Sequence, residues 1–405
     1  MGGPHATFHP DILQEMKLDA LCIGEGDHAI IKVLEAWENR IPLSGIPNIL
    51  PYNGILEEMK KELVQDLDAL PFADRQVFYD AAPEYRDFQL RSVLTGRGCP
   101  YRCSYCHNNA YNKMFGGSGK ILRRRSVDSV IEELKYIREF FAPMGMVRFG
   151  NDNFAYKIDD WLVELLDRYK KEIKVPFYCL LRPNCMSDEM GKLLADSGCY
   201  TVGMSLETGN EEHRQTILKR YVNDATAIQG FAISRKYKIR TIVNSMLALP
   251  GTTFKDDFNT FLFEKKVKPT NPTLGIWSPF PGTDITKFAM DIGALDKDYD
   301  FSKYFAERTP LKGYTEEEKD KQINLRNLGP IFCFLPDAFI PALTFLINRK
   351  PNFLYFLMGN LFVLSRRRVV FRPAVPKSLF AQLKVYFKSF LYVIESAPSE
   401  DLKNK

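Results

Sequence analysis

The sequence lacks several features that would place it in a special class of protein. Its 405 residues contain no long low-complexity tract, and the apolar stretch FLYFLMGNLFVL is far short of the roughly 20 residues that span a bilayer. The first residues, MGGPHATFHPD, show neither the basic stretch nor the apolar run of a secretory signal. The net charge of only +5 gives no indication of a nucleic acid partner. We therefore expect a globular, cytoplasmic protein that does not bind nucleic acid.

Cysteine is also scarce, but it is unevenly distributed. Only eight cysteines occur, and Cys99, Cys103 and Cys106 stand close together in TGRGCPYRCSYCHNNAY, residues 95–111. In a reducing cytosol, clustered cysteines more often bind metal or do chemistry than form disulfides. The others lie scattered in apolar surroundings and are interpreted as buried, inert thiols: Cys22, Cys179, Cys185, Cys199 and Cys333.

From about residue 90 the hydrophobic pattern becomes regular, and strand-like segments alternate with helical ones. The strand-like segments are LRSVLTG, MVRFG, FYCLLR, YTVGMSLE, TIVNSMLAL and LGIWSPF. Ser126 is well placed to cap the helix that follows the cysteine motif. Six such units predict an α/β fold, a partial (β/α)6 TIM-type barrel with a parallel sheet inside and helices outside.

The cysteine motif directly follows the first predicted strand, and ligands of such folds collect where strands end. Three thiolates on one loop can bind three corners of an iron–sulfur cube and leave a fourth iron open to a substrate or cofactor. A closed zinc site needs four ligands, usually as two separated pairs. His107 could supply a fourth ligand, but the chain has no second pair. We favour a 4Fe-4S cluster, with zinc or inert thiols as the alternatives.

The C-x3-C-x2-C motif after the first of six βα units resembles the radical S-adenosylmethionine (radical SAM) enzymes. The resemblance implies that Cys99, Cys103 and Cys106 hold the cluster and that its open iron binds SAM. It also implies an external electron donor of flavodoxin or ferredoxin type, and cleavage of SAM to a 5′-deoxyadenosyl radical or support of methyl transfer. Tyr105 matches the aromatic residue that packs near the adenine.

Four further residues match positions that contact SAM in this family. Asn151 and Asp152, in FGNDNF after the second strand, resemble an acidic pair that faces the SAM amino group, although Asn151 stands where Asp is more usual. Arg182 follows the third strand, and Glu207 stands at the end of the fourth, near the ribose and methionine parts of SAM. The resemblance assigns no catalytic residue.

The segment after the fifth strand departs from the family pattern. Where glycine-x-proline-glycine-glutamate is frequent, this chain reads ALPGTT, with Ala248 in place of the first glycine and Thr252 in place of the acid. Backbone contact to the adenine remains compatible with these residues. SPFPGTDI, residues 278–285, resembles the proline-glycine-threonine turn after the sixth strand. The resemblance covers about residues 90–290.

The first 47 residues resemble the last third of a cobalamin-binding, Rossmann-like domain. Gly2 and Gly3 match its paired glycines, which let backbone approach the nucleotide tail. His5 and His9 do not stand in the motif that supplies the cobalamin ligand, and the earlier strands are absent. The sequence therefore predicts a truncated Rossmann-like segment, from a fragment or a decayed domain, and makes cobalamin binding by this chain doubtful.

The predicted organisation is a cobalamin-domain remnant at 1–47, a linker at 48–88, a radical SAM core at 89–300 and a helical C-terminal region at 301–405. Residues 331–393 hold nine Lys or Arg against one acidic residue, Asp337, and fourteen Phe or Tyr. Such a segment could cap the barrel, or lie on an anionic membrane surface as a peripheral contact.

Together these patterns predict a radical SAM enzyme acting on an unknown, bulky and apolar substrate. Two alternatives remain from the sequence. One is a non-catalytic relic that keeps a structural metal or cluster site. The other is a membrane-surface binding module built on the C-terminal helices.

Overall fold

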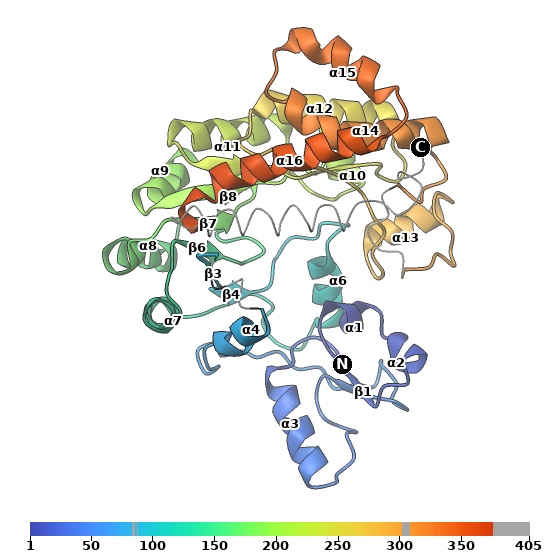
Figure 1. Cartoon of the computed structure of the whole chain (residues 1–405). Coiled ribbons are helices and arrows are strands. Elements are labelled where there is room, and N and C mark those ends of the chain that lie inside the picture. Colours follow the sequence, from blue (N-terminus) through green and yellow to red (C-terminus); the bar gives the residue numbers. More distant parts are fainter. Residues whose placement is uncertain (83–85, 87, 302–307, 376–405) are drawn as a thin grey trace. The chain divides into compact units, whose positions relative to one another are not determined.

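A computed structural model describes residues 1–82, 86, 88–301 and 308–375. The chain forms two compact units. The first contains residues 1–71, 96–125 and 279–288, and the second contains 72–95, 126–278 and the described chain from 289 onward. Figure 1 colours the chain along its sequence. The units do not follow the segments predicted from the sequence, whose assignment to separate domains stays a prediction.

The second unit is built on a parallel sheet with the strand order β3-β6-β7-β8-β9. The strands are β3 (Leu90–Val93), β6 (Met146–Phe149), β7 (Phe177–Leu180), β8 (Cys199–Gly203) and β9 (Arg240–Ile242). The predicted fifth strand is divided, because β10 (Ser245–Leu247) continues after β9 and pairs in parallel with β11 (Leu274–Ile276). A bridge between Ile242 and Asn271 links the two sheets. Every predicted strand is thus present, in a parallel arrangement that confirms the predicted α/β fold.

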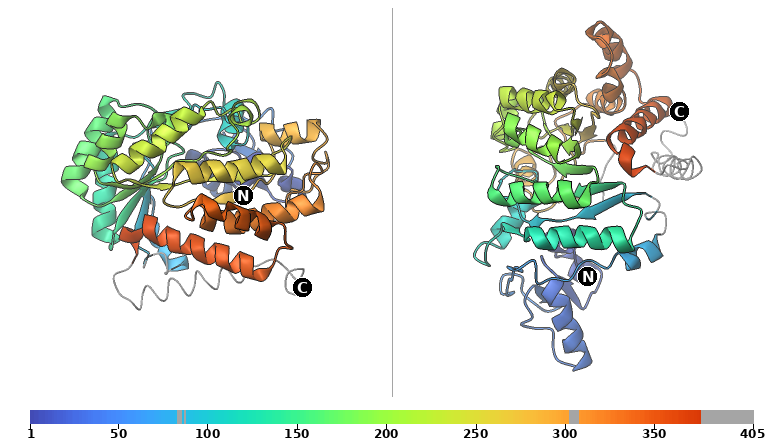
Figure 2. Two further views of the ribbon diagram at one scale, coloured as in Figure 1. Left: turned by 90° about the horizontal axis from the view of Figure 1, so that it is seen from above. Right: turned by 90° about the vertical axis from the view of Figure 1, so that its left-hand side faces the viewer.

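Helices follow the strands along one side of this sheet, drawn in green and yellow in Figures 1 and 2. They are α7 (Val127–Phe140), α8 (Asp160–Arg168), α9 (Asp188–Asp196), α10 (Glu211–Thr216), α11 (Asp224–Lys236) and α12 (Phe254–Val267). Side-chain caps begin several of them: Ser126 Oγ accepts from the backbone N of Ser129 at 3.1 Å, as predicted, and Ser187 caps α9 in the same way. Shorter turns lie at Tyr169–Ile173 and Pro183–Cys185, and α4 (Arg75–Ala81) precedes the sheet.

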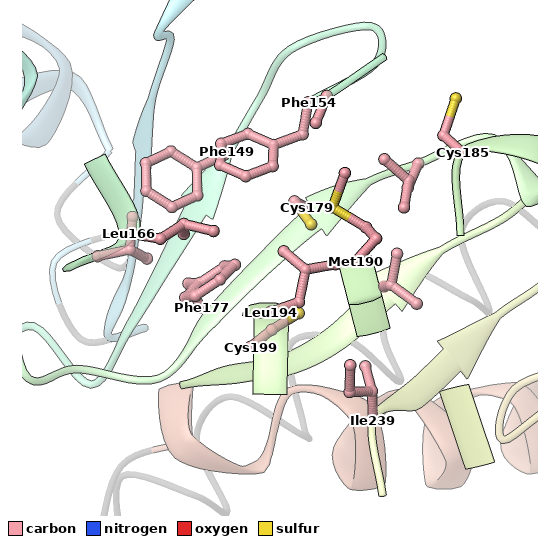
Figure 3. Close-up of a cluster of buried hydrophobic side chains, with 14 of the residues drawn as sticks. Phe149, Phe154, Leu166, Phe177, Cys179, Cys185, Met190, Leu194, Cys199 and Ile239 are labelled. Carbon is pink, nitrogen blue, oxygen red and sulfur yellow. The ribbon is translucent and has the colours of Figure 1, made fainter. Parts of the chain in front are cut away.

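The main core lies between the sheet and these helices (Figure 3). Phe149 of β6 and Phe177 of β7 are fully buried and meet edge to face, with ring centroids 5.3 Å apart. Leu166 of α8 and Leu194 of α9 pack against the same cluster. Full burial of such a side chain contributes about 1.5–3 kcal/mol each. The sheet and its helices are therefore fixed by one continuous apolar core.

The described C-terminal helices are α13 (Asp284–Asp291), α14 (Glu316–Phe332), α15 (Ile340–Ile347) and α16 (Phe353–Val370), with short turns at Asp337–Phe339 and Arg372–Ala374. The end of α16 packs on the other face of the five-stranded sheet. Tyr178 and Ile242 pack on Val370, whose carbonyl accepts a 2.7 Å hydrogen bond from Thr201. This part of the C-terminal region is thus a helical cap on the sheet, as one alternative predicted.

Among the described residues, no helix combines the length and apolar character needed to cross a bilayer. Part of the basic C-terminal segment, with Lys377, Lys384 and Lys388, lies outside the described residues. The membrane-surface alternative stays a prediction.

The first unit is smaller and contains short elements. They are α1 (Pro4–Phe8), α2 (Ile12–Glu15), β1 (Ala20–Cys22), α3 (Asp27–Glu38), β2 (Ile49–Pro51), β4 (Gly96–Arg97), α6 (His107–Met114) and β5 (Arg123–Arg124). β1 pairs antiparallel with β2, and β4 pairs antiparallel with β5. Its core is a small cluster that includes Leu13, Leu21, Ile23 and Leu50. β2 and α4 fall within residues 48–88, so this predicted linker carries regular structure.

Helix α3 shows that helical periodicity does not establish burial. Its small residues Ala29 and Ala36 are buried, whereas the side chains of Ile30, Leu34 and Trp37 are 54%, 50% and 77% exposed. Apolar residues at this spacing in the sequence predict a helix, and the structure contains one.

Candidate functional site

The cysteine loop lies in the first unit, between β4 and α6, and glycine is needed where it begins. A Cβ at Gly96 would lie 2.4 Å from the backbone O of Arg123 on the paired strand. Gly98 has φ +91°, and a Cβ there would lie 2.3 Å from the backbone O of Ile121. Only glycine fits such close backbone approach. The glycines of TGRG therefore bring residues 121–124 against the foot of the loop.

The three cysteines differ in exposure and are held by the backbone around them. Cys99 and Cys103 are buried and Cys106 is half-buried. The backbone N of Cys106 donates to the O of Cys103 at 3.2 Å, and the Asn112 amide of α6 donates to the O of Cys99 at 2.8 Å. Tyr105 is half-buried within the loop. The loop is thus folded onto the helix that follows it.

The turn after the sixth strand supports the same loop. The backbone N of Ile285 donates to the O of Ser104, between the second and third cysteines, at 3.1 Å. The Asp284 carboxylate accepts from Asn109 at 2.9 Å and from Lys113 at 2.6 Å, and both donors lie on α6. The structure therefore brings together two motifs that are about 180 residues apart in the sequence.

His107 joins this support. Its Nε2 lies 3.1 Å from the Pro281 carbonyl, so that nitrogen carries the proton and donates. Its ring stacks on Phe8 of α1, with centroids 4.1 Å apart, and meets Phe280 edge-on at 5.5 Å. Burial lowers the pKa of His107, which favours the neutral ring. The nitrogen that donates to Pro281 cannot at the same time bind a metal, which weakens His107 as a fourth ligand.

The loop and its flanks carry positive charge only. Residues 96–125 contain seven Lys or Arg and no Asp or Glu. Arg97 donates to both oxygens of Asp27 at 2.7 and 3.0 Å, and these bonds hold the pKa of Asp27 below its usual value. Arg123 is buried and donates to both oxygens of Glu25 at 2.9 and 2.8 Å. Two of these cations are thus paired with acidic residues outside the segment, whereas Arg102 is an exposed cation within the cysteine motif itself.

This donor set fits an iron–sulfur cube better than a single ion. Within the described residues, no three Cys, His, Asp or Glu side chains are grouped tightly enough to hold one metal ion. A cube asks for a different arrangement, because each thiolate binds its own iron. The three free cysteines of this loop can each bind one iron of a cube. The zinc alternative gains no support.

In the second unit, the remaining predicted residues follow neighbouring parallel strands. Asn151 and Asp152 come after β6, Arg182 after β7 and Glu207 after β8. Since β6, β7 and β8 are adjacent and parallel, these residues lie along one edge of the sheet. The Asn151 side-chain oxygen accepts from both the backbone N and the hydroxyl of Thr95, at 3.2 and 3.1 Å. These residues thus follow adjacent strands, as the sequence pattern indicates, and their contacts with SAM stay a prediction.

The side chains at this edge differ in their environment. Asp152 is exposed, whereas Arg182 and Glu207 are buried. The Nε of Arg182 donates to the side chain of Asn184 at 3.2 Å. Glu207 has an Oε1 atom 3.9 Å from the Nη1 of Arg220, a buried cation that also donates to the backbone O of Ser205 at 2.7 Å. Sequence reasoning missed Arg220, because it stands in the mostly polar stretch NEEHRQTILKR and resembles an ordinary surface charge.

The segment after the fifth strand, where the sequence departs from the family pattern, is held by hydrogen bonds from other parts of the second unit. Ala248 is fully buried with φ +58°, a left-handed conformation that glycine adopts more easily. Its backbone N donates to the Asp257 carboxylate at 2.7 Å. The Thr252 hydroxyl lies 2.8 Å from the hydroxyl of Tyr314. Asp257 and Tyr314 are residues that the sequence did not single out.

Burial also bears on the scattered cysteines. Cys199 lies in the core, and burial, with a further contribution from neighbouring Cys179, raises its pKa well above the ordinary value. A thiol that stays protonated is a poor metal ligand and nucleophile. This environment agrees with the inert role predicted for Cys199.

Comparison with known proteins identifies the part of the chain that carries these features. Residues 93–262 match the family model of the radical SAM superfamily. An uncharacterized methyltransferase of Pyrococcus horikoshii is 26% identical over 299 residues, which are 72% of this chain and 62% of that protein. Cytidylyl-2-hydroxyethylphosphonate methyltransferase of Streptomyces wedmorensis is 24% identical over 264 residues, 55% of this chain and 47% of that protein. The chain thus spans about half to two thirds of the length of these relatives.

The fold is similar to that of a solved relative. The radical SAM methyltransferase TsrM of Kitasatospora setae, solved with cobalamin and a 4Fe-4S cluster bound, matches 92% of this chain and 80% of its own, with a TM-score of 0.60 and 15% identity. Residues 93–262, which match the family model, contain all three loop cysteines and the predicted residues of the sheet edge: Asn151, Asp152, Arg182 and Glu207. By the family match, residues 93–262 of this chain form a radical SAM domain.

Proposed function

We propose that this chain is a radical SAM enzyme whose cluster is held by Cys99, Cys103 and Cys106. The observation that carries the proposal is the three-cysteine loop inside the matched family region, on a segment of purely positive charge. A bound and reduced 4Fe-4S cluster supplies the electron that cleaves SAM. The chain's own contribution is to hold the loop shape, through Asn112 on the Cys99 carbonyl and Ile285 on the Ser104 carbonyl.

The strand-end residues are proposed to bind and orient SAM. Glu207 is buried, and its Oε1 lies 3.9 Å from Arg220, so its carboxyl group suits a hydroxyl or ammonium donor. Asp152 is exposed at the same edge and is the better candidate for the cationic amino group. Asn151 is already bonded to Thr95, which favours a role in shaping the edge. A charge-assisted hydrogen bond of this kind contributes roughly 1.5–3 kcal/mol.

Methyl transfer is the outcome we favour for this chemistry. Both curated relatives described above are named methyltransferases. We propose a bulky, apolar substrate, because the C-terminal helices expose Phe345, Leu354 and Leu361. The same side chains, with the arginines near the end of α16, would support peripheral contact with an anionic membrane. Sedimentation with anionic liposomes at low salt would support that contact; absence from the pellet at every salt concentration would remove it.

Cobalamin does not follow from the residues of this chain. Among the described residues of the first unit, β1 and β2 form a two-stranded antiparallel sheet, and the Gly2–Gly3 pair is the only matched corrinoid feature. We therefore derive no step through cobalamin. Purified chain is expected to lose hydroxocobalamin during gel filtration, and stoichiometric retention would contradict this.

The proposed reaction needs one electron from outside the chain. We propose an acidic flavodoxin- or ferredoxin-type donor, which the charge of residues 96–125 would attract. Arg102 and Lys120 are exposed cations on this segment.

The proposed function is tested by anaerobic reconstitution with iron and sulfide, followed by addition of dithionite and SAM. We expect broad iron–sulfur absorbance and release of 5′-deoxyadenosine or S-adenosylhomocysteine. Zinc in place of iron, with SAM left intact, would support the relic alternative instead.

A further inference from the structure

Two residues other than glycine hold left-handed backbone conformations at consecutive strand ends in the second unit. Glu207, after β8, has φ +69°, and Ala248, after β10, has φ +58°. The two positions are linked, because the backbone N of Met246 donates to the O of Glu207 at 2.7 Å. Such conformations persist only when their surroundings hold them, and they concentrate at functional sites. What holds Ala248 is therefore informative.

Asp257, on the first turns of α12, holds Ala248. Its Oδ1 accepts from the Ala248 backbone N at 2.7 Å, and its Oδ2 accepts from the Gln322 amide at 2.7 Å. Asp257 is 2% exposed and Gln322 is fully buried. A buried carboxyl group costs free energy to place in a core, so a carboxyl bonded at both oxygens serves geometry more than general stability.

Tyr314 holds the other end of the same turn, residues 248–252, which we name the fifth-strand turn. Its hydroxyl lies 2.8 Å from the Thr252 hydroxyl and donates to the Leu249 carbonyl at 3.1 Å. The Thr252 hydroxyl also lies 2.9 Å from that carbonyl. Tyr314 is buried and stands just before α14, and Gln322 is within α14. The C-terminal region thus supports both ends of the turn.

We propose that Asp257, Gln322 and Tyr314 are positioning residues that hold the fifth-strand turn in the shape that receives the nucleoside part of SAM. This inference rests on the proposed function. The three side chains are buried and contact the turn without touching SAM themselves. They would favour SAM binding because a turn that already has its bound shape loses little conformational freedom when SAM binds. Their hydrogen bonds hold Ala248 at its positive φ, a conformation that a glycine at position 248 would adopt without such support.

The test measures SAM binding by equilibrium dialysis on the reconstituted chain, with iron content and the unfolding midpoint determined in parallel. Asp257→Ala is expected to weaken SAM binding about tenfold with iron content unchanged. Adding Ala248→Gly to that variant is expected to restore most of the affinity, because glycine adopts positive φ without a partner. Asp257→Asn, which keeps an acceptor for Ala248 and gains a donor for the Gln322 oxygen, is expected to bind SAM like the wild type.

Asp256 offers a matched control one residue away. It caps α12 through the backbone N of Thr253 at 3.0 Å, so Asp256→Ala is expected to lower the unfolding midpoint and leave SAM affinity unchanged. If Asp257→Ala does not fold, Tyr314→Phe removes one hydroxyl only and is expected to raise the KM for SAM about threefold with kcat unchanged.

Two results would overturn the inference while the proposed function stands. One is unchanged SAM affinity in Asp257→Ala and Tyr314→Phe, with only the unfolding midpoint lowered. The other is failure of Ala248→Gly to restore affinity, which would show that Asp257 does not act through the turn. A wild-type chain that binds iron but no SAM would instead remove the proposed function, and the positioning role with it.

Discussion

The cysteine loop and the sheet edge reach their shapes by different means. The loop is held by glycine contacts and by hydrogen bonds from Asn112, Ile285 and His107, next to a small apolar cluster. The edge is set by strands anchored in the large core around Phe149 and Phe177. The cysteine spacing of the loop can be read directly from the sequence, although distant residues such as Ile285 support its shape. The edge contains no such motif, and the periodicity of the strands that form it indicates where it lies.

Substitution of the loop cysteines should separate the two regions most strongly. Cys99→Ala, Cys103→Ala or Cys106→Ala is expected to abolish SAM cleavage, because an iron loses its ligand. Cys179→Ala and Cys199→Ala, in the core behind the edge, are the controls and should keep both iron and cleavage. Iron content and 5′-deoxyadenosine release measure the outcome. Equal loss from all five variants would show that the loop has no special role.

Substitutions at the sheet edge should change the affinity for SAM and leave the iron content unchanged. Glu207→Ala and Asp152→Ala are each expected to weaken SAM binding by about 10- to 150-fold with normal iron content, the loss of one charge-assisted hydrogen bond. Equilibrium dialysis measures this, and Glu212→Ala, on the exposed side of the nearby helix α10, is the control. Unchanged affinity in both variants would remove these residues from the site.

A smaller effect, on the rate of SAM cleavage, should show whether the electron donor docks at the cysteine loop. Arg102→Gln and Lys120→Glu are expected to slow SAM cleavage driven by reduced flavodoxin about threefold to tenfold, and less at high salt. Cleavage driven by dithionite should be unchanged. Lys255→Glu, an exposed charge reversal in the second unit, is the control. Equal slowing with both reductants would point to damage of the cluster rather than weaker docking.

The last prediction concerns the stability of the second unit and not its activity. Burial raises the pKa of Asp257 to about 7 from an ordinary value of 3.8. Between those values the folded chain keeps a proton that the unfolded chain has lost, so stability falls as pH rises, by up to about 1.4 kcal/mol per pH unit. Urea midpoints measured from pH 4 to 8 should show a flatter profile for Asp257→Asn. Parallel profiles would contradict the raised pKa.

Much of the fold followed from the sequence because periodicity and capping are local. The strands, the helices between them and the Ser126 cap were predicted. The break between β9 and β10 was not, since an apolar run such as TIVNSMLAL contains no signal for it. The exposure of Ile30 and Trp37 on α3 could not be predicted either. Apolar residues at helical spacing show that they share one face of a helix, but they do not show whether another element packs against that face.

The supports of the site were the least predictable part. Asp284 contacts α6 from about 170 residues away, and Gln322 reaches Asp257 across 65 residues. Such pairs depend on tertiary packing, and a single sequence carries no local pattern for them. Arg220 and Asp257 resemble ordinary surface charges until their burial is known.

The central claim is that three cysteines hold a cluster with one iron open to SAM. Electron paramagnetic resonance of the reduced, reconstituted chain tests this most directly, with and without SAM. We predict a 4Fe-4S signal whose g-values shift when SAM is added, with the signal lost in Cys103→Ala. A cluster signal that SAM leaves unchanged, or a metal-loaded chain without a 4Fe-4S signal, would contradict the account.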